Sequence, residues 1–422
     1  MSGPAVLAPA GSVDGRAAFL DEDAGRPRDG LAMQDAPRSV AVFRALQLGD
    51  WLCATPALAA LRAAWPGARI DVAGLPSTRE LMRRLAGQGL VDDFIEFPGI
   101  PEFPEQPARG AAALRAFLAT MRGRDYDLAL QMHGSGGQSN PIVAGFGARR
   151  WAGFVPSARL AQPGRLMAWP DRLPEPRRYL ALLRFLGLPA RDEALRLPLD
   201  PGDHEQAALL AERHGLDPAR TVLLHPGARL PSRRWPAGRF AALARALAAD
   251  GWQTALTGSG DERAITAEVA AAGPPGLVDL TGQTTLGVLG ALLARVRLLV
   301  CNDTGVSHVA AAVRTPSVVV ASGSDAARWA PLDGRLHRVL ALPIPCRPCA
   351  HSVCPIGHPC ALGVTVAQAR AQADALLAAG GPGVAAREGA GLAAPRRHPA
   401  GRLAGAPAHP AGMPASRRRA AR

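Results

Sequence analysis

Short apolar runs alternate with amphipathic stretches over most of the chain, starting near residue 39. In the first half, strands are predicted over 39–43, over ARIDVAG and over YDLALQM. Helices are predicted over 55–64 and 78–85, with Thr55 and Pro56 as N-cap and first helical residue of the earlier one. A Pro- and Arg-rich region then interrupts the pattern until residue 221.

The second half of the chain carries the clearest alternation. Strands are predicted at 221–225, 252–257, 276–280, 297–301 and 317–321. Helices are predicted at 237–249, from 261, at 286–294 and at 306–313. Alternating strands and helices favour parallel sheets covered by helices on both faces. The two series together predict an α/β protein with two doubly wound, Rossmann-like domains facing across a cleft.

The segments outside this alternation predict the domain boundaries. Residues 1–37 and 380–422 are rich in Gly, Pro and Ala without apolar periodicity, and we expect disordered tails there, the second one basic. Between them we expect an N-terminal Rossmann-like domain over 38–200 and a C-terminal Rossmann-like domain over 201–362. The second domain includes a Cys-rich loop at 346–360, and a C-terminal helix follows over 363–379.

Composition narrows the class of ligand. The 422 residues are 48% hydrophobic and 20% charged, which is typical of soluble globular proteins. No apolar stretch reaches the length of a membrane span, and the N-terminus lacks a signal-peptide pattern. All 48 basic residues are arginine and the formal net charge is +13, which favours an anionic ligand or an acidic membrane surface. Aromatic residues make up only 5%, so nucleic acid is not expected as a partner.

The strongest local signal is the segment DTGVSH, which follows a predicted strand and opens a helix. Thr304, Gly305, Val306 and Ser307 would present free backbone N–H groups at a helix N-terminus, which is a favourable place for a phosphate. His308 lies one turn after Thr304 and could donate to the same phosphate. The alternative is that Asp303 or Thr304 only caps the helix and His308 packs on its surface.

Asp50 lies just after the first strand and follows a glycine. It is either a helix cap or a general base that faces the cleft. Neither a GxGxxG fingerprint nor a Walker A motif is present, and the second is impossible because the chain contains no lysine.

Four cysteines lie close together near the end of the second predicted domain, at Cys346, Cys349, Cys354 and Cys360, with His351 and His358 between them. Their spacing allows a structural zinc site, although only one CxxC pair is present. The alternative is a loop of reduced thiols. Cys53 and Cys301 stand alone in apolar segments and are expected in the core.

Taken in order, these residues resemble the GT-B, heptosyltransferase-like enzymes of glycosyltransferase family 9. The resemblance covers about residues 38–379. Its motifs are Arg44-x5-Asp50 with Thr55-Pro56-Ala57-Leu58, the strand YDLALQMHG, His225-Pro226-Gly227-Ala228, Arg233-Arg234-Trp235-Pro236, Leu256-Thr257-Gly258-Ser259 and DTGVSHVAAA from Asp303. The Cys-rich segment also looks like one found in some members.

The resemblance implies a role for each matching position. Asp50 would deprotonate the acceptor hydroxyl, and Arg233, where lysine is usual, would hold the donor diphosphate. Glu262 would bind the ribose hydroxyls and Thr284 would lie in the adenine pocket. The segment from Asp303 through Thr304, Gly305 and Val306 to His308 would hold the sugar diphosphate.

The resemblance also implies that the domain over 38–200 is the acceptor domain and the domain over 201–362 the nucleotide-sugar donor domain. Acceptor residues are less well marked. Arg79, Arg83 and Arg84 would form a basic turn near the acceptor cleft, or alternatively a solvated helix face. Gln47, Leu48 and Trp51 replace the small hydroxylic residues often found around the base, which leaves the acceptor open.

The resemblance therefore implies an inverting, metal-independent transfer of heptose from ADP-heptose to a lipopolysaccharide core or related surface glycan. Expected partners are the nucleotide sugar, a phosphorylated glycolipid acceptor and the membrane surface. Peripheral attachment at the cytoplasmic face of a bacterial inner membrane is expected, with no cofactor needed for catalysis. Alternatives are another nucleotide sugar, a nucleotide-sugar epimerase and a non-enzymatic anion-binding protein.

Overall fold

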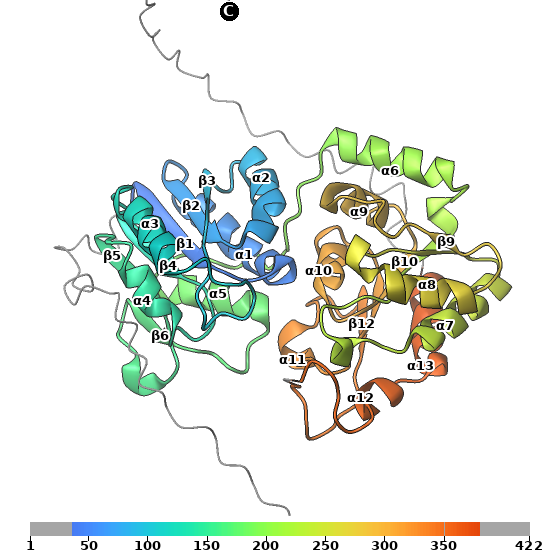
Figure 1. Ribbon diagram of the computed structural model, residues 1–422. Coiled ribbons are helices and arrows are strands. Elements are labelled where there is room, and N and C mark those ends of the chain that lie inside the picture. The colour runs from blue at the N-terminus through green and yellow to red at the C-terminus, as the bar shows by residue number, and fades with distance from the viewer. Residues whose placement is uncertain (1–35, 350, 380–422) are drawn as a thin grey trace, which may run out of the picture. The chain divides into compact units, whose positions relative to one another are not determined.

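The computed structural model describes residues 36–349 and 351–379, and the ribbon in Figure 1 follows the chain through them. The tails predicted over 1–37 and 380–422 lie outside the described residues, apart from residues 36 and 37. The described part contains two six-stranded sheets in which every neighbouring pair of strands is parallel. The predicted α/β class with two doubly wound sheets is confirmed.

The first sheet has the strand order β3-β2-β1-β4-β5-β6. Its strands are β1 (Ser39–Arg44), β2 (Arg69–Gly74), β3 (Asp93–Glu96), β4 (Leu128–Gln131), β5 (Arg150–Val155) and β6 (Leu166–Ala168). Its helices are α1 (Leu48–Ala64), η2 (Pro76–Thr78), α2 (Arg79–Gly87), α3 (Ala111–Arg122), α4 (Ser139–Ala144), η3 (Ala158–Leu160) and α5 (Glu175–Phe185). Val40 and Val42 of β1 pack with α1, α2 and α5, whereas Ala41 and Phe43 pack with α3 and α4. Successive residues of a strand point to opposite faces, so this sheet is covered on both.

The second sheet has the order β12-β11-β10-β7-β8-β9. Its strands are β7 (Thr221–His225), β8 (Gln253–Leu256), β9 (Val278–Asp279), β10 (Leu298–Asn302), β11 (Ser317–Val320) and β12 (His337–Leu340). Its helices are α6 (Pro201–Arg213), η4 (Pro218–Arg220), η5 (Pro231–Arg233), α7 (Ala237–Ala249), η6 (Gly260–Glu262), α8 (Arg263–Ala272), α9 (Leu286–Leu293), α10 (Gly305–Ala312), α11 (Ala326–Trp329), α12 (Pro359–Leu362) and α13 (Val366–Ala378). Val222 and Leu224 pack with α7 and α13, and Leu223 packs on the other face with α9 and α10.

The first helix begins seven residues earlier than its sequence predicts. We expected Thr55 and Pro56 to open it, but α1 starts at Leu48 and contains Pro56 inside it. A proline within a helix leaves the carbonyl four residues before it without its usual N–H donor. Here the Thr55 hydroxyl donates to that carbonyl, on Leu52, at 2.7 Å. The longer helix brings Asp50 into its first turn.

The Pro- and Arg-rich region that interrupted the pattern is also ordered. It contains β5, β6, α5 and α6, of which β6 has only three residues. Short strands and proline-rich helix starts give little periodic signal, so sequence alone does not mark them. Elsewhere the predicted bounds are close, and α7 matches its predicted range of 237–249.

One hydrophobic cluster is shared by the two sheets. It contains Val42 and Leu130 from the first sheet and Leu223 and Leu299 from the second. The N-terminal turns of α1 and α10 also meet, because a Cβ placed on Gly49 would lie 3.0 Å from the Gly305 Cα. Among the described residues, no helix has the length and apolar character to cross a membrane.

Candidate active site

A cavity of about 580 Å3 is lined by loops that follow strands of both sheets. From the first sheet it receives Leu46, Gln47, Leu48, Gly49, Asp50, Glu105, His133 and Gly134. From the second it receives Ala228, Arg229, Leu230, Arg233, Asp303, Thr304, Gly305, His308, Arg328 and Trp329. Ligands of parallel α/β sheets bind outside the carboxyl ends of the strands, and these residues lie there.

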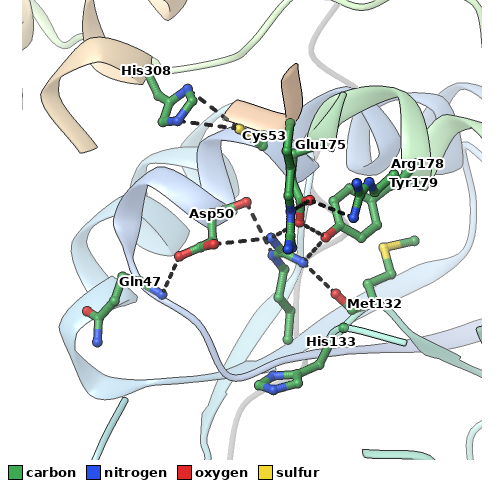
Figure 2. Close-up of polar contacts among 12 residues, drawn as sticks. Gln47, Asp50, Cys53, Met132, His133, Glu175, Arg178, Tyr179 and His308 are labelled. Carbon is green, nitrogen blue, oxygen red and sulfur yellow. Dashed lines mark hydrogen bonds and ion pairs between the residues drawn. The ribbon is translucent and has the colours of Figure 1, made fainter. Parts of the chain in front are cut away.

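Asp50 is held in place by its own helix and by Arg44. It is the third residue of α1, where its Oδ2 accepts a hydrogen bond from the Gln47 N–H at 3.2 Å in a capping box. Its Oδ1 lies 3.8 Å from Arg44 Nη2, and its side chain remains 21% exposed. Burial raises the pKa of Asp50, while the nearby Arg44 guanidinium acts in the opposite direction. Asp50 therefore takes part in the capping box of α1 and also lines the cavity, and Figure 2 shows the orientation of its side chain.

His133 follows β4 and stacks against Phe103, with ring centroids 4.1 Å apart. The Ala45 N–H donates to its Nδ1 at 3.1 Å, so the ring proton must reside on Nε2. Burial, together with the charge of Arg44, lowers the pKa of His133 to about 3. The imidazole therefore stays neutral at ordinary pH and offers an N–H donor.

The opposite wall carries cationic groups that lack carboxylate partners. Arg229 and Arg233 lie in the loop after β7, and in the described part of the chain neither side chain forms an ion pair. The Arg233 Nε is buried and has no hydrogen-bond partner. A buried donor without a partner is costly, and an anionic ligand would satisfy it.

The start of α10 adds backbone donors to the same wall. Thr304 is its N-cap, but the Thr304 side chain does not cap the helix. The Ser307 N–H donates to the Thr304 carbonyl at 3.0 Å and is therefore not free as predicted, so within the described residues only the Gly305 and Val306 N–H groups of the first turn remain for other acceptors. His308, one turn along, lies 3.6 Å through its Nδ1 from the Cys53 Sγ of α1. Burial lowers the pKa of His308, although Asp303 and Asp50 raise it. The Thr304 side chain therefore does not act as a cap, and the anion-site role of this segment stays a prediction.

A buried asparagine organises the loops of this wall. Asn302, at the end of β10, accepts a hydrogen bond from the Trp235 N–H at 2.8 Å and donates to the Pro226 carbonyl at 2.8 Å. The Trp235 indole N–H donates to the Val364 carbonyl at 2.9 Å. These bonds fix the path of the chain on both sides of Arg233.

Glu262 lies beside this cavity, at the end of η6. A Cβ on Gly227 would lie only 1.9 Å from its Oε1, so only glycine allows this approach. Its Oε2 accepts from the Ser259 N–H at 2.8 Å, and Oε1 lies 3.6 Å from His225 Nε2. Burial alone would raise the pKa of Glu262, but His225 and the Ser259 backbone outweigh it and lower the pKa to about 2. The carboxylate is therefore ionised at ordinary pH.

The structure brings most of the predicted site residues together. Asp50, Arg233, Asp303, Thr304, Gly305 and His308 all line the cavity. Val306 is buried in α10, and Thr284 precedes the N-cap of α9, so neither is part of the lining. Glu262 also lies beside the lining rather than in it. The roles of all these predicted site residues stay predictions.

The three predicted acceptor arginines on α2 lie outside this cavity. Arg79 pairs with Glu96 at 2.8 Å and Arg83 with Glu80 at 2.9 Å. Arg84 is buried and pairs with Asp203 of α6. Each guanidinium is thus already bound to a carboxylate, and a role in acceptor binding stays a prediction without geometric support.

Several cavity residues escaped sequence reasoning. Four of the lining residues belong to none of the recognised motifs, and sequence alone did not show that they line one cavity: Glu105, Arg229, Arg328 and Trp329. Glu175 was also missed, because it begins a helix inside the Pro- and Arg-rich region. His133 had one signal, its position directly after a predicted strand.

The four clustered cysteines, with His358, line a narrow space beside Ser232 and Gly323. The described residues contain no group of three or more His, Cys, Asp or Glu placed to hold a metal ion. The zinc hypothesis therefore stays a prediction. The loop does support the Arg233 segment, because the Ser232 hydroxyl donates to the His351 carbonyl at 2.6 Å.

Comparison with known proteins places the chain in a family. The family model for glycosyltransferase family 9 (heptosyltransferase) matches residues 114–359, more than half of the chain. Lipopolysaccharide heptosyltransferase 2 of Escherichia coli is 28% identical over 313 residues, which cover 70% of this chain and 85% of that protein. Lipooligosaccharide heptosyltransferase 2 of Haemophilus influenzae is 36% identical over 121 residues, 28% of this chain and 33% of that protein.

The fold is shared with a solved structure from the same family. The structure of the E. coli ADP-heptose lipopolysaccharide heptosyltransferase II aligns with a TM-score of 0.61 and 23% identity, over 81% of this chain and 99% of that chain. This likeness confirms the GT-B fold expected from the sequence. The chain therefore belongs to glycosyltransferase family 9 and is a glycosyltransferase.

Proposed function

We propose that this enzyme transfers heptose from ADP-heptose to a sugar hydroxyl of a lipopolysaccharide core, with inversion at the anomeric carbon and without a metal ion in the chemical step. The names of its relatives support this choice of donor and acceptor, since they include an ADP-heptose lipopolysaccharide heptosyltransferase II and two enzymes that act on lipopolysaccharide or lipooligosaccharide.

The observation that carries the proposal is that opposite charges line one cavity, the negative charge from one sheet and the positive charges from the other. Asp50 supplies a carboxylate from the first sheet, and Arg229 and Arg233 supply guanidinium groups from the second that form no ion pair with the described residues. Glycosyl transfer from a nucleotide sugar needs both, because a hydroxyl must lose a proton while a diphosphate leaves with added negative charge.

In this proposal Asp50 is the general base. Its carboxylate accepts the proton of the acceptor hydroxyl as the hydroxyl oxygen bonds to the anomeric carbon from the face opposite the diphosphate. The bond between that carbon and the diphosphate oxygen breaks at the same time, and ADP leaves. The raised pKa that burial gives Asp50 makes it a stronger base than an exposed aspartate.

Arg233 and the first turn of α10 would bind the diphosphate. Their N–H groups are fixed before the donor arrives, so they stabilise the developing charge without reorganising. The ionised Glu262 would accept hydrogen bonds from the ribose hydroxyls, and Thr284 would lie near the adenine. His133, neutral with its proton on Nε2, would donate to a sugar hydroxyl.

The remaining assignments are proposals of the same kind. The acceptor is a phosphorylated glycolipid, and the enzyme works at the cytoplasmic face of the inner membrane as a peripheral protein. The net charge of +13 favours such a surface, because anionic lipids attract basic proteins. A zinc ion at the Cys-rich loop would have a structural role only.

Calorimetric titration with ADP, UDP, GDP and CMP in EDTA tests the donor assignment. We expect ADP to bind at least about tenfold more tightly than the other three, a difference of ~1.4 kcal/mol. Preference for UDP or GDP would keep the glycosyltransferase and reject the heptose donor. Binding that disappears in EDTA and returns with Mg2+ would reject the metal-independent mechanism.

A further inference from the structure

A buried carboxylate that the mechanism above does not use lies behind Asp50. Glu175 opens α5, and its side chain is fully buried. Its Oε1 accepts from Arg44 Nη2 at 3.1 Å and from the Tyr179 hydroxyl, and its Oε2 accepts from Arg328 Nε at 2.7 Å. Figure 2 shows Glu175 beside Tyr179, with Asp50 on the other side of Glu175 in this view. Arg178 Nη1 also lies 3.7 Å from the Glu175 Oε2. A buried charge persists only where partners compensate its lost hydration, and these four side chains do so for Glu175.

Arg44 connects Glu175 to the base. It is fully buried at the end of β1. Its Nε donates to the Asp50 carbonyl at 3.2 Å, and its Nη1 donates to the Met132 carbonyl at 2.6 Å. Its Nη2 bonds Glu175 and lies 3.8 Å from Asp50 Oδ1. One guanidinium thus holds the backbone and faces the carboxylate of Asp50.

Arg328 connects Glu175 to the other wall. It belongs to α11, which follows β11 of the second sheet, and it lines the cavity. The Asp325 side chain caps this helix by accepting from the Arg328 N–H at 3.3 Å. The guanidinium carbon lies 4.5 Å from the centre of the Trp329 ring. Both the backbone and the guanidinium of Arg328 are therefore held in place. Its hydrogen bond to Glu175 connects a helix that follows the second sheet with a helix of the first.

We propose that Glu175 is a positioning residue that holds Arg44 against Asp50 and, through Arg328, ties the base to the opposite wall of the cavity. The position and the ionisation of the Asp50 carboxylate then depend on the contact between Glu175 and Arg328. This inference rests on the proposed role of Asp50 as the base.

The electrostatics of Asp50 give this arrangement a distinctive signature. The charged and titratable groups that face Asp50 are Arg44 from β1, Cys53 from α1, Glu175 from α5, His308 from α10 and Arg328 from α11. Burial makes the largest contribution and raises the Asp50 pKa, and Arg44 lowers it. Glu175 raises that pKa further, whereas Arg328 lowers it. Removing these two charges must therefore shift the pKa of Asp50 in opposite directions.

The test compares Glu175→Gln, Arg328→Gln and the double variant in the pH dependence of kcat. The assay uses ADP-heptose and lipopolysaccharides truncated at successive core positions. We expect the acidic limb to move to lower pH in Glu175→Gln, to higher pH in Arg328→Gln and back toward the wild type in the double variant. Misplacement of the base should also lower kcat by roughly 10- to 100-fold in Glu175→Gln, with a smaller change in the donor KM.

Glu193→Gln is the matched control. Glu193 pairs with Arg177 of α5 at 2.7 Å, but this pair is exposed and does not line the active-site cavity. Its loss should leave the pH profile and kcat unchanged. Equal effects of Glu193→Gln and Glu175→Gln would reduce Glu175 to a general contributor to stability and overturn the proposal.

An infrared titration separates this inference from the proposed function, because it needs no acceptor. The protonated carboxyl band of Asp50 is obtained as the difference between each protein and the same protein carrying Asp50→Asn. We expect the same opposite shifts of its midpoint. Shifts in one direction, or no shift in folded Arg328→Gln, would overturn the proposal even if Glu175→Gln did not fold. A wild type without transfer but with the expected shifts would reject the proposed function alone.

Discussion

Asp50 and Arg233 line the same cavity, but they differ in how far their polar atoms are already bonded to other described residues. The Asp50 carboxylate already has a backbone N–H donor and a nearby guanidinium, so it is ordered before any substrate binds. Arg233 has a buried Nε without a partner, so its interactions are completed by a ligand. Preorganised groups stabilise a transition state most effectively because they need not reorient. The ordered base and the unpaired cation are what a hydroxyl and a leaving diphosphate require.

Replacing Arg233 with alanine should weaken ADP binding more than it weakens the fold. Hydrogen bonds to charged groups contribute about 1.5–3 kcal/mol, so we expect ADP affinity to fall by roughly 10- to 100-fold. Calorimetry measures the affinity, and thermal unfolding measures stability. Arg338→Ala, an exposed arginine of β12 outside the cavity, is the control. Equal ADP affinity in Arg233→Ala and the wild type would remove Arg233 from the donor site.

At the scale of elements, the sequence predicts what depends on local pattern. The range of α7 follows from its apolar periodicity and the preceding Trp-Pro, and the strand ends that carry His133, His225 and Asp303 follow from short apolar runs. The start of α1 was missed because Pro56 resembles a first helical residue. Only the Thr55 hydroxyl bond to Leu52 explains why the helix passes through it.

The parts of the site that depend on distant contacts could not be predicted. Glu175 and Arg328 are 153 residues apart, and nothing near either one indicates that they pair. The same holds for Arg84 and Asp203, which are 119 apart and turn an apparent basic patch into a buried ion pair. Motifs located the proposed base and the proposed anion site, whereas the charged residues that contact them could be identified only from the structure.

The approach of α1 to α10 predicts unequal effects of two glycine substitutions. Gly49 and Gly202 are both the second residue of a helix, α1 and α6. A Cβ on Gly49 would lie 3.0 Å from the Gly305 Cα and 3.1 Å from the His308 ring, whereas a Cβ on Gly202 would meet nothing within 4 Å. Gly49→Ala should therefore destabilise the fold by about 1–3 kcal/mol and weaken ADP binding.

Gly202→Ala serves as the control, and it should be neutral or stabilise the helix by up to about 1 kcal/mol. Chemical denaturation and calorimetry measure both effects. If Gly49→Ala were as stable as Gly202→Ala, the two helix N-termini would not be in contact in solution.

At the scale of the whole molecule, several described groups have depressed pKa values, among them two histidines and two glutamates with large shifts. Burial lowers the pKa of His133 to about 3 and that of His337 to about 4, and partners outweigh burial to lower the pKa of Glu175 and Glu262 to about 2. For each of them the unfolded state binds protons at a higher pH than the folded state does. The free energy of unfolding must therefore fall as pH decreases from about 6.5 to about 2.

His337→Asn should reduce the first part of this loss. His337 is buried in β12, where its Nδ1 lies 2.8 Å from the Ser317 hydroxyl, an interaction that an asparagine amide can replace. Removing this titration should shrink the loss of unfolding free energy between pH 6.5 and pH 4 by on the order of 2–3 kcal/mol. Urea denaturation at several pH values measures it, with the exposed His204→Asn as control. An unchanged slope would show that His337 titrates normally in the folded protein.

Heptosyl transfer by Asp50→Asn in EDTA tests the central claim most directly. Asparagine keeps the size of the side chain but cannot accept the proton, and general-base catalysis contributes about 10²- to 10⁴-fold to rate. We predict that the wild type transfers heptose from ADP-heptose to a truncated lipopolysaccharide in EDTA. Asp50→Asn should lose at least about 100-fold in kcat while its ADP affinity stays within about threefold of the wild type. Transfer by Asp50→Asn at the wild-type rate would contradict the account.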